Sequence, residues 1–160
     1  MPFPALNVAR RHEPVATDTI YSDMPAVDDG STCAQFFTGL DTKFCDAYGM
    51  KTDGDFISTL LAVIHKQGGM DKLVSDRAQA ETLKKVQDIL CHLCIDDWQS
   101  EAHYQHQNKA KHCCKHVKEC VNMVLNTSGV PANCWLLMPK VHLFHLQPDG
   151  YGKSELENST

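Results

Sequence analysis

The chain has 160 residues, of which 42% are hydrophobic and 22% are charged, and its formal net charge is −5. This length and composition are those of one globular domain with a single sizeable core, and they exclude a disordered or fibrous chain. The negative charge argues against a generally basic protein that coats nucleic acid, although a local basic face remains open.

Two further features exclude classes of protein. The longest apolar stretch, CWLLMPKVHLFHL at 134–146, is interrupted by Pro139 and Lys140 and is too short to span a bilayer, so we expect no membrane partner. The first 20 residues contain no apolar run of the signal-peptide kind. We therefore expect an intracellular setting, with the eight cysteines reduced, buried or metal-bound rather than paired in disulfides.

The first half of the chain reads as strands followed by a helix. Residues 1–16 lack periodicity and are interpreted as an N-terminal arm. The run TDTIYSDM at 17–24 predicts a strand, and residues 33–38 and 43–50 predict a hairpin. A helix is expected over 55–67, with Asp53 as its N-cap and Gly68-Gly69 as its end.

The second half alternates short extended pieces with helices. We expect a strand at 72–75 ending on Asp76, a helix at 80–93, an extended piece at 95–98 and a helix at 109–126. Gly129-Val130-Pro131 breaks that helix, a short apolar helix at 132–137 follows, and 147–160 is interpreted as a disordered tail. This order predicts an α/β domain over 17–146, a mixed sheet flanked by helices.

Two aspartates are predicted to sit where strands end, Asp23 in IYSDM and Asp76 in KLVSD. A carboxylate held at a strand terminus suits a hard divalent cation. The plain alternative is that both are turn-forming aspartates.

An ordered set of motifs favours the interpretation of Asp23 and Asp76 as ligands of a divalent cation. The set comprises YSD, VDDGSTCAQFF, FISTLL, GGMDKLVSDRAQAE and IDDWQSEAHYQHQNKAK. It resembles the catalytic core of retroelement integrases, most of all the copia-type cores of retrotransposon polyproteins. The resemblance runs from about Asn7 to Leu137, roughly four-fifths of the chain.

The resemblance implies a ribonuclease H-like fold whose two Asp and one Glu hold two Mg²⁺ or Mn²⁺ ions for polynucleotidyl transfer in DNA integration. DNA is the implied partner, a homo-oligomer is possible, and the nucleus is the implied location of a functional copy. Asp23 and Asp76 match the first and second carboxylates of the family.

The third carboxylate is missing from its expected place. Where the family has Q-N-x-A-E, this chain has Gln107-Asn108-Lys109-Ala110-Lys111, so Lys111 occupies the position of the glutamate. An ammonium group does not coordinate a cation, and we therefore expect a degenerate, catalytically impaired copy. Glu101 is the one acid that we consider as a substitute.

Basic residues of the same predicted helix suggest a second role. Lys109, Lys115 and Lys118, together with Lys111, form a positive strip that in an integrase-like protein would contact DNA phosphates. The alternative is that they are solvated surface lysines.

A zinc module is the competing reading. Cys91-x₂-Cys94 and His112-x₃-His116 have ligand-like spacings, and two histidines four apart share one side of a helix. The intervening loop is longer than that of a zinc finger, and the cysteines fall inside a predicted amphipathic helix. The alternative for these cysteines is helix packing.

Overall fold

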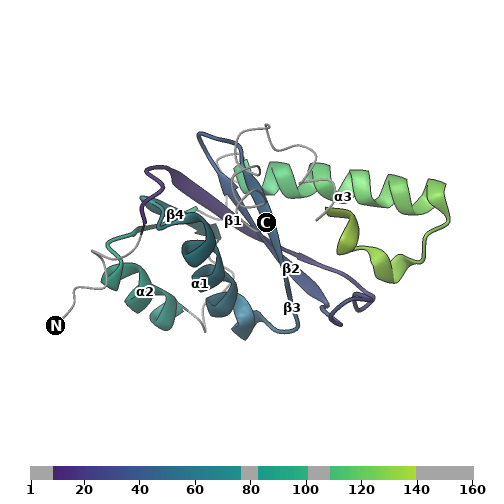
Figure 1. Ribbon diagram of the computed structural model, residues 1–160, viewed down its shortest axis with the longest axis horizontal. Coiled ribbons are helices and arrows are strands. Elements are labelled where there is room, and N and C mark those ends of the chain that lie inside the picture. The colour runs from purple at the N-terminus through teal and green to yellow at the C-terminus, as the bar shows by residue number, and fades with distance from the viewer. Residues whose placement is uncertain (1–8, 77–82, 101–108, 140–160) are drawn as a thin grey trace, which may run out of the picture.

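The computed structural model describes residues 9–76, 83–100 and 109–139. Its central element is a five-stranded mixed sheet (Figure 1). The strands lie in the order β3-β2-β1-β4-β5. Their bounds are β1 Pro14–Tyr21, β2 Cys33–Gly39, β3 Cys45–Met50, β4 Lys72–Asp76 and β5 Asp96–Ser100. β1, β2 and β3 form an antiparallel meander, whereas β4 pairs in parallel with both β1 and β5.

Helices cover both faces of this sheet. They are α1 Phe56–Gln67, preceded by the 3₁₀ turn η2 Asp53–Asp55, then α2 Leu83–His92 and α3 Lys109–Ser128, followed by the 3₁₀ turn η4 Ala132–Cys134. α1 and α2 lie on one face, and α3 with the segment after it lies on the other (Figure 1). The predicted mixed sheet flanked by helices is confirmed.

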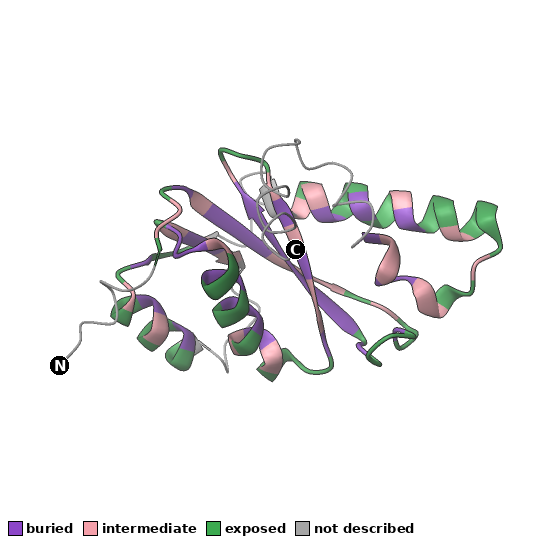
Figure 2. Ribbon diagram, viewed as in Figure 1, coloured by how far each residue is buried: buried purple, intermediate pink, exposed green. Residues whose placement is uncertain are grey.

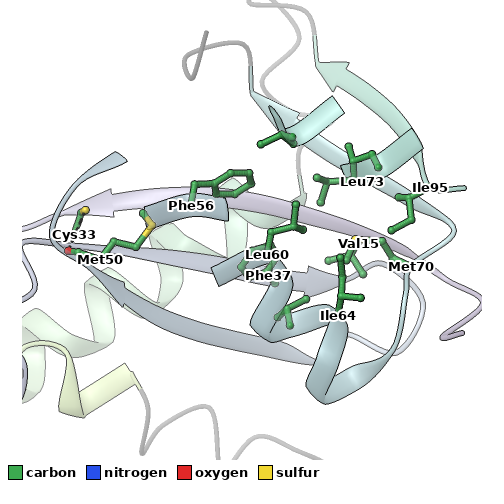
Figure 3. Packing of buried hydrophobic residues seen from close by; sticks show 13 residues of the cluster. Val15, Cys33, Phe37, Met50, Phe56, Leu60, Ile64, Met70, Leu73 and Ile95 are labelled. Carbon is green, nitrogen blue, oxygen red and sulfur yellow. Dashed lines mark hydrogen bonds between the residues drawn. The ribbon is translucent and has the colours of Figure 1, made fainter. Parts of the chain in front are cut away.

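The period of two along each strand divides the apolar side chains between the two faces. On the side of α1 and α2, Val15, Phe37 and Leu73 from three strands meet Leu60 of α1 (Figure 3). The ring of Phe37 stacks on Phe56 with centroids 6.2 Å apart. The cluster's other buried members are Cys33, Met50, Val63, Ile64, Met70, Val86, Leu90 and Ile95.

The opposite face carries a second cluster, to which both the strands and α3 contribute. Phe36 of β2 packs among Cys114, Val117 and Val121 of α3. The remaining buried members are Ala26, Ala34, Cys45, Ala47, Trp135 and Leu136. The buried stripe along α3 and its exposed opposite side are visible in Figure 2, and they show how the 3.6-residue period seats the helix on the sheet.

Several predicted boundaries shift. α1 begins at Phe56 with Asp55 as its N-cap, while Asp53, the predicted cap, begins the preceding 3₁₀ turn. The helix ends at Gly68 as predicted, where φ is 93° and an added Cβ would lie 2.8 Å from the carbonyl oxygen of Ala9. Only glycine tolerates both the left-handed backbone and this close approach.

The interpretation of residues 1–16 as an arm is wrong for the part that the structure describes. Arg10 forms an isolated parallel bridge with Gly69, and β1 already begins at Pro14. Glu13 is buried and accepts hydrogen bonds from Arg11 Nε (2.6 Å) and from the backbone N–H of Thr42 (3.1 Å). A polar network, rather than an apolar period, holds this segment, which explains why periodicity did not reveal it.

The strand predicted over 17–24 ends earlier, at Tyr21, and the apolar helix predicted over 132–137 contains the 3₁₀ turn η4. The predicted tail at 147–160 lies outside the described residues. In the part of the chain that the structure describes, no helix has the length and apolar character that crossing a bilayer requires.

Replacement of Leu60 by Ala tests the core beneath α1. The side chain is fully buried, so removing its apolar packing and leaving a cavity should lower the free energy of unfolding by about 3–5 kcal/mol. Leu61→Ala is the matched control, because its neighbouring side chain is 46% exposed and its removal should cost less than about 1 kcal/mol. Urea unfolding of both variants measures the difference, and equal effects would contradict this packing.

Replacement of Glu13 by Gln tests the polar network. Burial acts to raise the pKa of Glu13, but hydrogen bonds from Thr42 and the hydrogen bond and charge of Arg11 outweigh it and hold the pKa below its ordinary value of 4.5. The ionised carboxylate therefore stabilises the fold above that value, and this stability is lost as pH falls through the lowered pKa. Glu13→Gln should cost about 1–3 kcal/mol at pH 7 and progressively less in acid, measured by urea unfolding across pH. A cost that does not change with pH would contradict the assignment.

Candidate functional site

Two aspartates each lie two residues beyond the last pair of β1 with β4. The parallel register joins Pro14 to Lys72 and Ala16 to Val74. The paired register ends there; continued by two residues along both strands, it would set Asp18 in the middle of β1 level with Asp76, the last residue of β4. Adjacent strands lie about 4.8 Å apart, so in this continued register the two positions would be neighbours on the two strands.

Asp18 belongs to the face of the sheet that α3 covers. Asp18 pairs with Phe36 of β2, which belongs to the second cluster. Ile20, two residues further along β1, packs against the same cluster. Burial raises the pKa of the Cys114 thiol, and the negative charge of Asp18 raises it further. Cys114 of α3 therefore lies near the Asp18 carboxylate. The start of α3 therefore lies over the Asp18 position.

Lys111 lies one helical turn before Cys114, on the same side of α3. Its side chain is partly buried, whereas the Lys115 side chain is exposed. The helix thus brings the Lys111 position toward the strand that carries Asp18. The arrangement is two aspartates on adjacent strands, of which Asp18 lies beneath the helix that carries the basic Lys111.

The structure does not place Asp23 beside Asp18 and Asp76. The expectation that Asp23 ends the first strand is not met. β1 stops at Tyr21, and Asp23 lies in an exposed bend of the segment that leads to β2. A strand advances about 3.3 Å per residue, so Tyr21 is already roughly 10 Å beyond the level of Asp18. In Figure 1 this connection lies at the end of β1 away from β4.

Asp18 is the residue that the sequence reasoning missed. Its signal was present in PVATDTIY, since aspartate is disfavoured inside strands and here interrupts an otherwise strand-forming run. The prediction placed the carboxylate at the end of the strand instead. The deciding information is the β1–β4 register, which no local pattern contains.

The lysines of the predicted strip are arranged along α3. Lys115 and Lys118 are exposed, and they follow Lys111 at four and seven residues, spacings that share one side of a helix. Lys109 is the first residue of α3, and its side chain lies outside the described part of the structure. Glu101, the considered substitute acid, also lies outside the described residues.

The four residues of the zinc reading are not brought together. Cys91 is in α2 and Cys94 just follows it, on the face of the sheet opposite to α3, which carries His112 and His116. Within residues 9–76, 83–100 and 109–139 there is no group of three or more His, Cys, Asp or Glu side chains that could hold a metal ion. Both cysteines are exposed, so helix packing does not account for them either.

The residue types at the site fit a hard divalent cation only in part. Aspartate oxygens at the Asp18 and Asp76 positions are the ligands that Mg²⁺ and Mn²⁺ prefer. The third position holds the ammonium group of Lys111, which carries no lone pair for a metal. Two of the three expected donors are present.

No protein-family model matches the chain, and no curated protein matches it. Solved structures do. A chain of the simian T-cell lymphotropic virus intasome, in complex with PP2A regulatory subunit B56 gamma, superposes with a TM-score of 0.64 at 13% identity over 85% of this chain and 48% of that one. The HTLV-2 integrase catalytic core domain in complex with magnesium, in its dimeric form, gives a TM-score of 0.61 at 14% identity over 84% and 86%.

The chain spans about half the length of the first of these structures and most of the second. At this level of identity the comparisons establish the fold, which is the ribonuclease H-like α/β fold of retroviral integrase catalytic cores.

Proposed function

We propose that the chain is an integrase-type core that binds DNA and descends from an enzyme of DNA integration. The observation that carries the proposal is the β1–β4 register, whose last pair, Ala16 and Val74, precedes both Asp18 and Asp76 by two residues, with Asp18 on the face that α3 covers. The similarity of fold to integrase cores supports it independently. In this proposal Asp18 takes the role of first carboxylate that the sequence had assigned to Asp23.

The roles of the residues follow from their charges. Asp18 and Asp76 would hold Mg²⁺ or Mn²⁺, whose chemistry when bound is to activate an attacking oxygen and to stabilise the leaving oxygen of a phosphodiester. The exposed side chains of Lys115 and Lys118 would bind backbone phosphates, holding the DNA along α3. Hydrophobic packing of α3 on the sheet would hold the lysines of α3 at a fixed position relative to the aspartates of the strands.

Lys111 is the basis for proposing that this copy is impaired. At an effective dielectric constant of about 20, two unit charges 4 Å apart interact by about 4 kcal/mol. Exchanging a carboxylate for an ammonium group beside a dication replaces attraction by repulsion on that scale.

We propose copia-type ancestry, nuclear localisation and a homo-oligomeric state on the strength of the motif resemblance.

A non-enzymatic DNA-binding remnant is the second candidate, and Lys111 is the observation that favours it. The zinc module loses its support because the sheet separates its proposed ligands. Metal analysis of the purified chain distinguishes these cases, since stoichiometric zinc that disappears in His112→Ala would restore the module.

The variant Lys111→Glu tests the proposed site. It should restore the third carboxylate and raise Mg²⁺- or Mn²⁺-dependent strand transfer at least about 100-fold above the original chain, the scale on which one charge-stabilising group acts. The assay joins a labelled DNA end to a target duplex.

Two further substitutions in the Lys111→Glu background separate the candidate carboxylates. Asp18→Asn should abolish the restored activity, whereas Asp23→Asn, the matched control in the exposed bend, should leave it unchanged. The opposite result would return the first-carboxylate role to Asp23. A folded Lys111→Glu chain that remains inactive, with no gain in metal binding, would contradict the proposal.

The DNA-binding role of α3 has its own test. Replacing Lys115 and Lys118 by Ala should weaken duplex binding and reduce the slope of log K against log salt by about 0.9 for each phosphate that the helix no longer neutralises. Lys84→Ala with Lys85→Ala is the matched control, because these exposed lysines lie on α2 at the other face of the sheet. Fluorescence anisotropy across a salt series measures both. Equal weakening in the two double variants would show that binding follows total charge and not this helix.

A further inference from the structure

Two cysteines far apart in the sequence meet where α3 lies on the sheet. Cys113 Sγ lies 3.5 Å from Cys45 Sγ, although 68 residues separate them. Cys45 is the first residue of β3, and Cys113 is near the start of α3. No role in the proposed function falls to this pair.

The surroundings divide the pair into an accessible thiol and a protected one. Cys45 is buried, and it accepts a hydrogen bond from the Thr38 hydroxyl (3.4 Å). Cys113 is only partly buried and is therefore the more accessible residue of the pair.

The environment of Cys113 also favours its thiolate. The hydrogen bond that it shares with Cys45 lowers the pKa of Cys113 most, with smaller contributions from Thr38 and from His116 and His112 on the same helix, against the opposing effect of burial. Conversely, the hydrogen bond with Cys113 and then burial raise the pKa of Cys45. A thiolate is the form of cysteine that reacts with oxidants.

We propose that Cys113 is a peroxide-reactive thiol and that Cys45 is its resolving partner, so that oxidation ties α3 to β3 by a disulfide. The geometry carries this inference, because the two sulfurs are in contact and need to approach by about 1.5 Å, a movement within reach of side-chain rotation, to bond at about 2.05 Å. The inference does not rest on the proposed function.

The chemistry balances with a hydroperoxide as the oxidant. The Cys113 thiolate attacks one peroxide oxygen, so an S–O bond forms, the O–O bond breaks, and the sulfur is oxidised to sulfenic acid. The departing hydroxide or alkoxide takes up the proton that the thiol released on ionising and leaves as water or an alcohol. The Cys45 sulfur then attacks the Cys113 sulfur. An S–S bond forms, the S–O bond breaks, and the departing hydroxide takes the Cys45 proton as water.

The test uses the full chain and hydrogen peroxide. The intact mass should fall by two hydrogens, six of the eight thiols should remain free, and a tryptic map should link the peptide FCDAYGMK at 44–51 to HCCK at 112–115. A dithiol reductant should reverse the change. The cross-link closes a long loop of the unfolded chain, so the oxidised protein should also melt at a higher temperature.

Variants identify the sulfurs, since the peptide HCCK contains Cys114 as well. Cys113→Ser should abolish the link, whereas Cys114→Ser and the exposed Cys91→Ser should retain it. Cys45→Ser should leave Cys113 trapped as a sulfenic acid that dimedone labels. Should Cys45→Ser fail to fold, the partly exposed Cys113→Ser still decides the question.

Three results would overturn the proposal. One is a link that survives Cys113→Ser. Another is a first disulfide that joins a different pair, such as Cys91 with Cys94. The third is persistence of both Cys45 and Cys113 as thiols after peroxide has oxidised the exposed cysteines.

Discussion

Parallel hydrogen bonding between β1 and β4 is the constraint on which the rest of the arrangement depends. This pairing joins residues near the start of the chain to residues almost sixty positions later, beginning with Pro14 and Lys72. It fixes the alignment of β1 with β4, and a shift by one position would move every β1 side chain to the opposite face. Val15 and Leu73 resist such a shift, because both are buried beneath α1.

The same pairing explains why the two faces of the sheet differ in character. One face is closed by a continuous apolar layer under α1 and α2. The other combines apolar packing beneath α3 with the polar position Asp18 within the strand. The retroviral integrase cores share this fold, and Asp18, which we propose for chemistry, lies on the α3 side of the sheet.

Local patterns predicted most elements of the fold. The hairpin of β2 and β3 and the helix ending at Gly68 came from turn residues and from apolar spacing, which act over a few positions. α3 was predicted to begin at Lys109, and it does. These successes share one physical cause, namely that strand and helix periods are visible within about ten residues of sequence.

The site was harder to predict because its geometry is long-range. Asp23 and Asp18 are both in or near one strand, and only the pairing with β4 distinguishes them. The segment at Arg10 to Glu13 was missed for a related reason, since it is held by backbone groups of Gly69 and Thr42, which are distant in sequence. The contact between Cys45 and Cys113 likewise has no local signature.

The two apolar clusters have a consequence for synthesis of the chain. Every member of the cluster beneath α1 and α2 precedes residue 96, whereas the cluster beneath α3 needs residues from Cys114 to Leu136. The N-terminal part of the chain leaves the ribosome first, so the residues that cover one face of the sheet are available early. Phe36 and Ala47 on the other face stay exposed until α3 and the segment after it have been synthesised. This half-covered nascent stage, rather than the finished molecule, is where a holdase chaperone would find the most to bind.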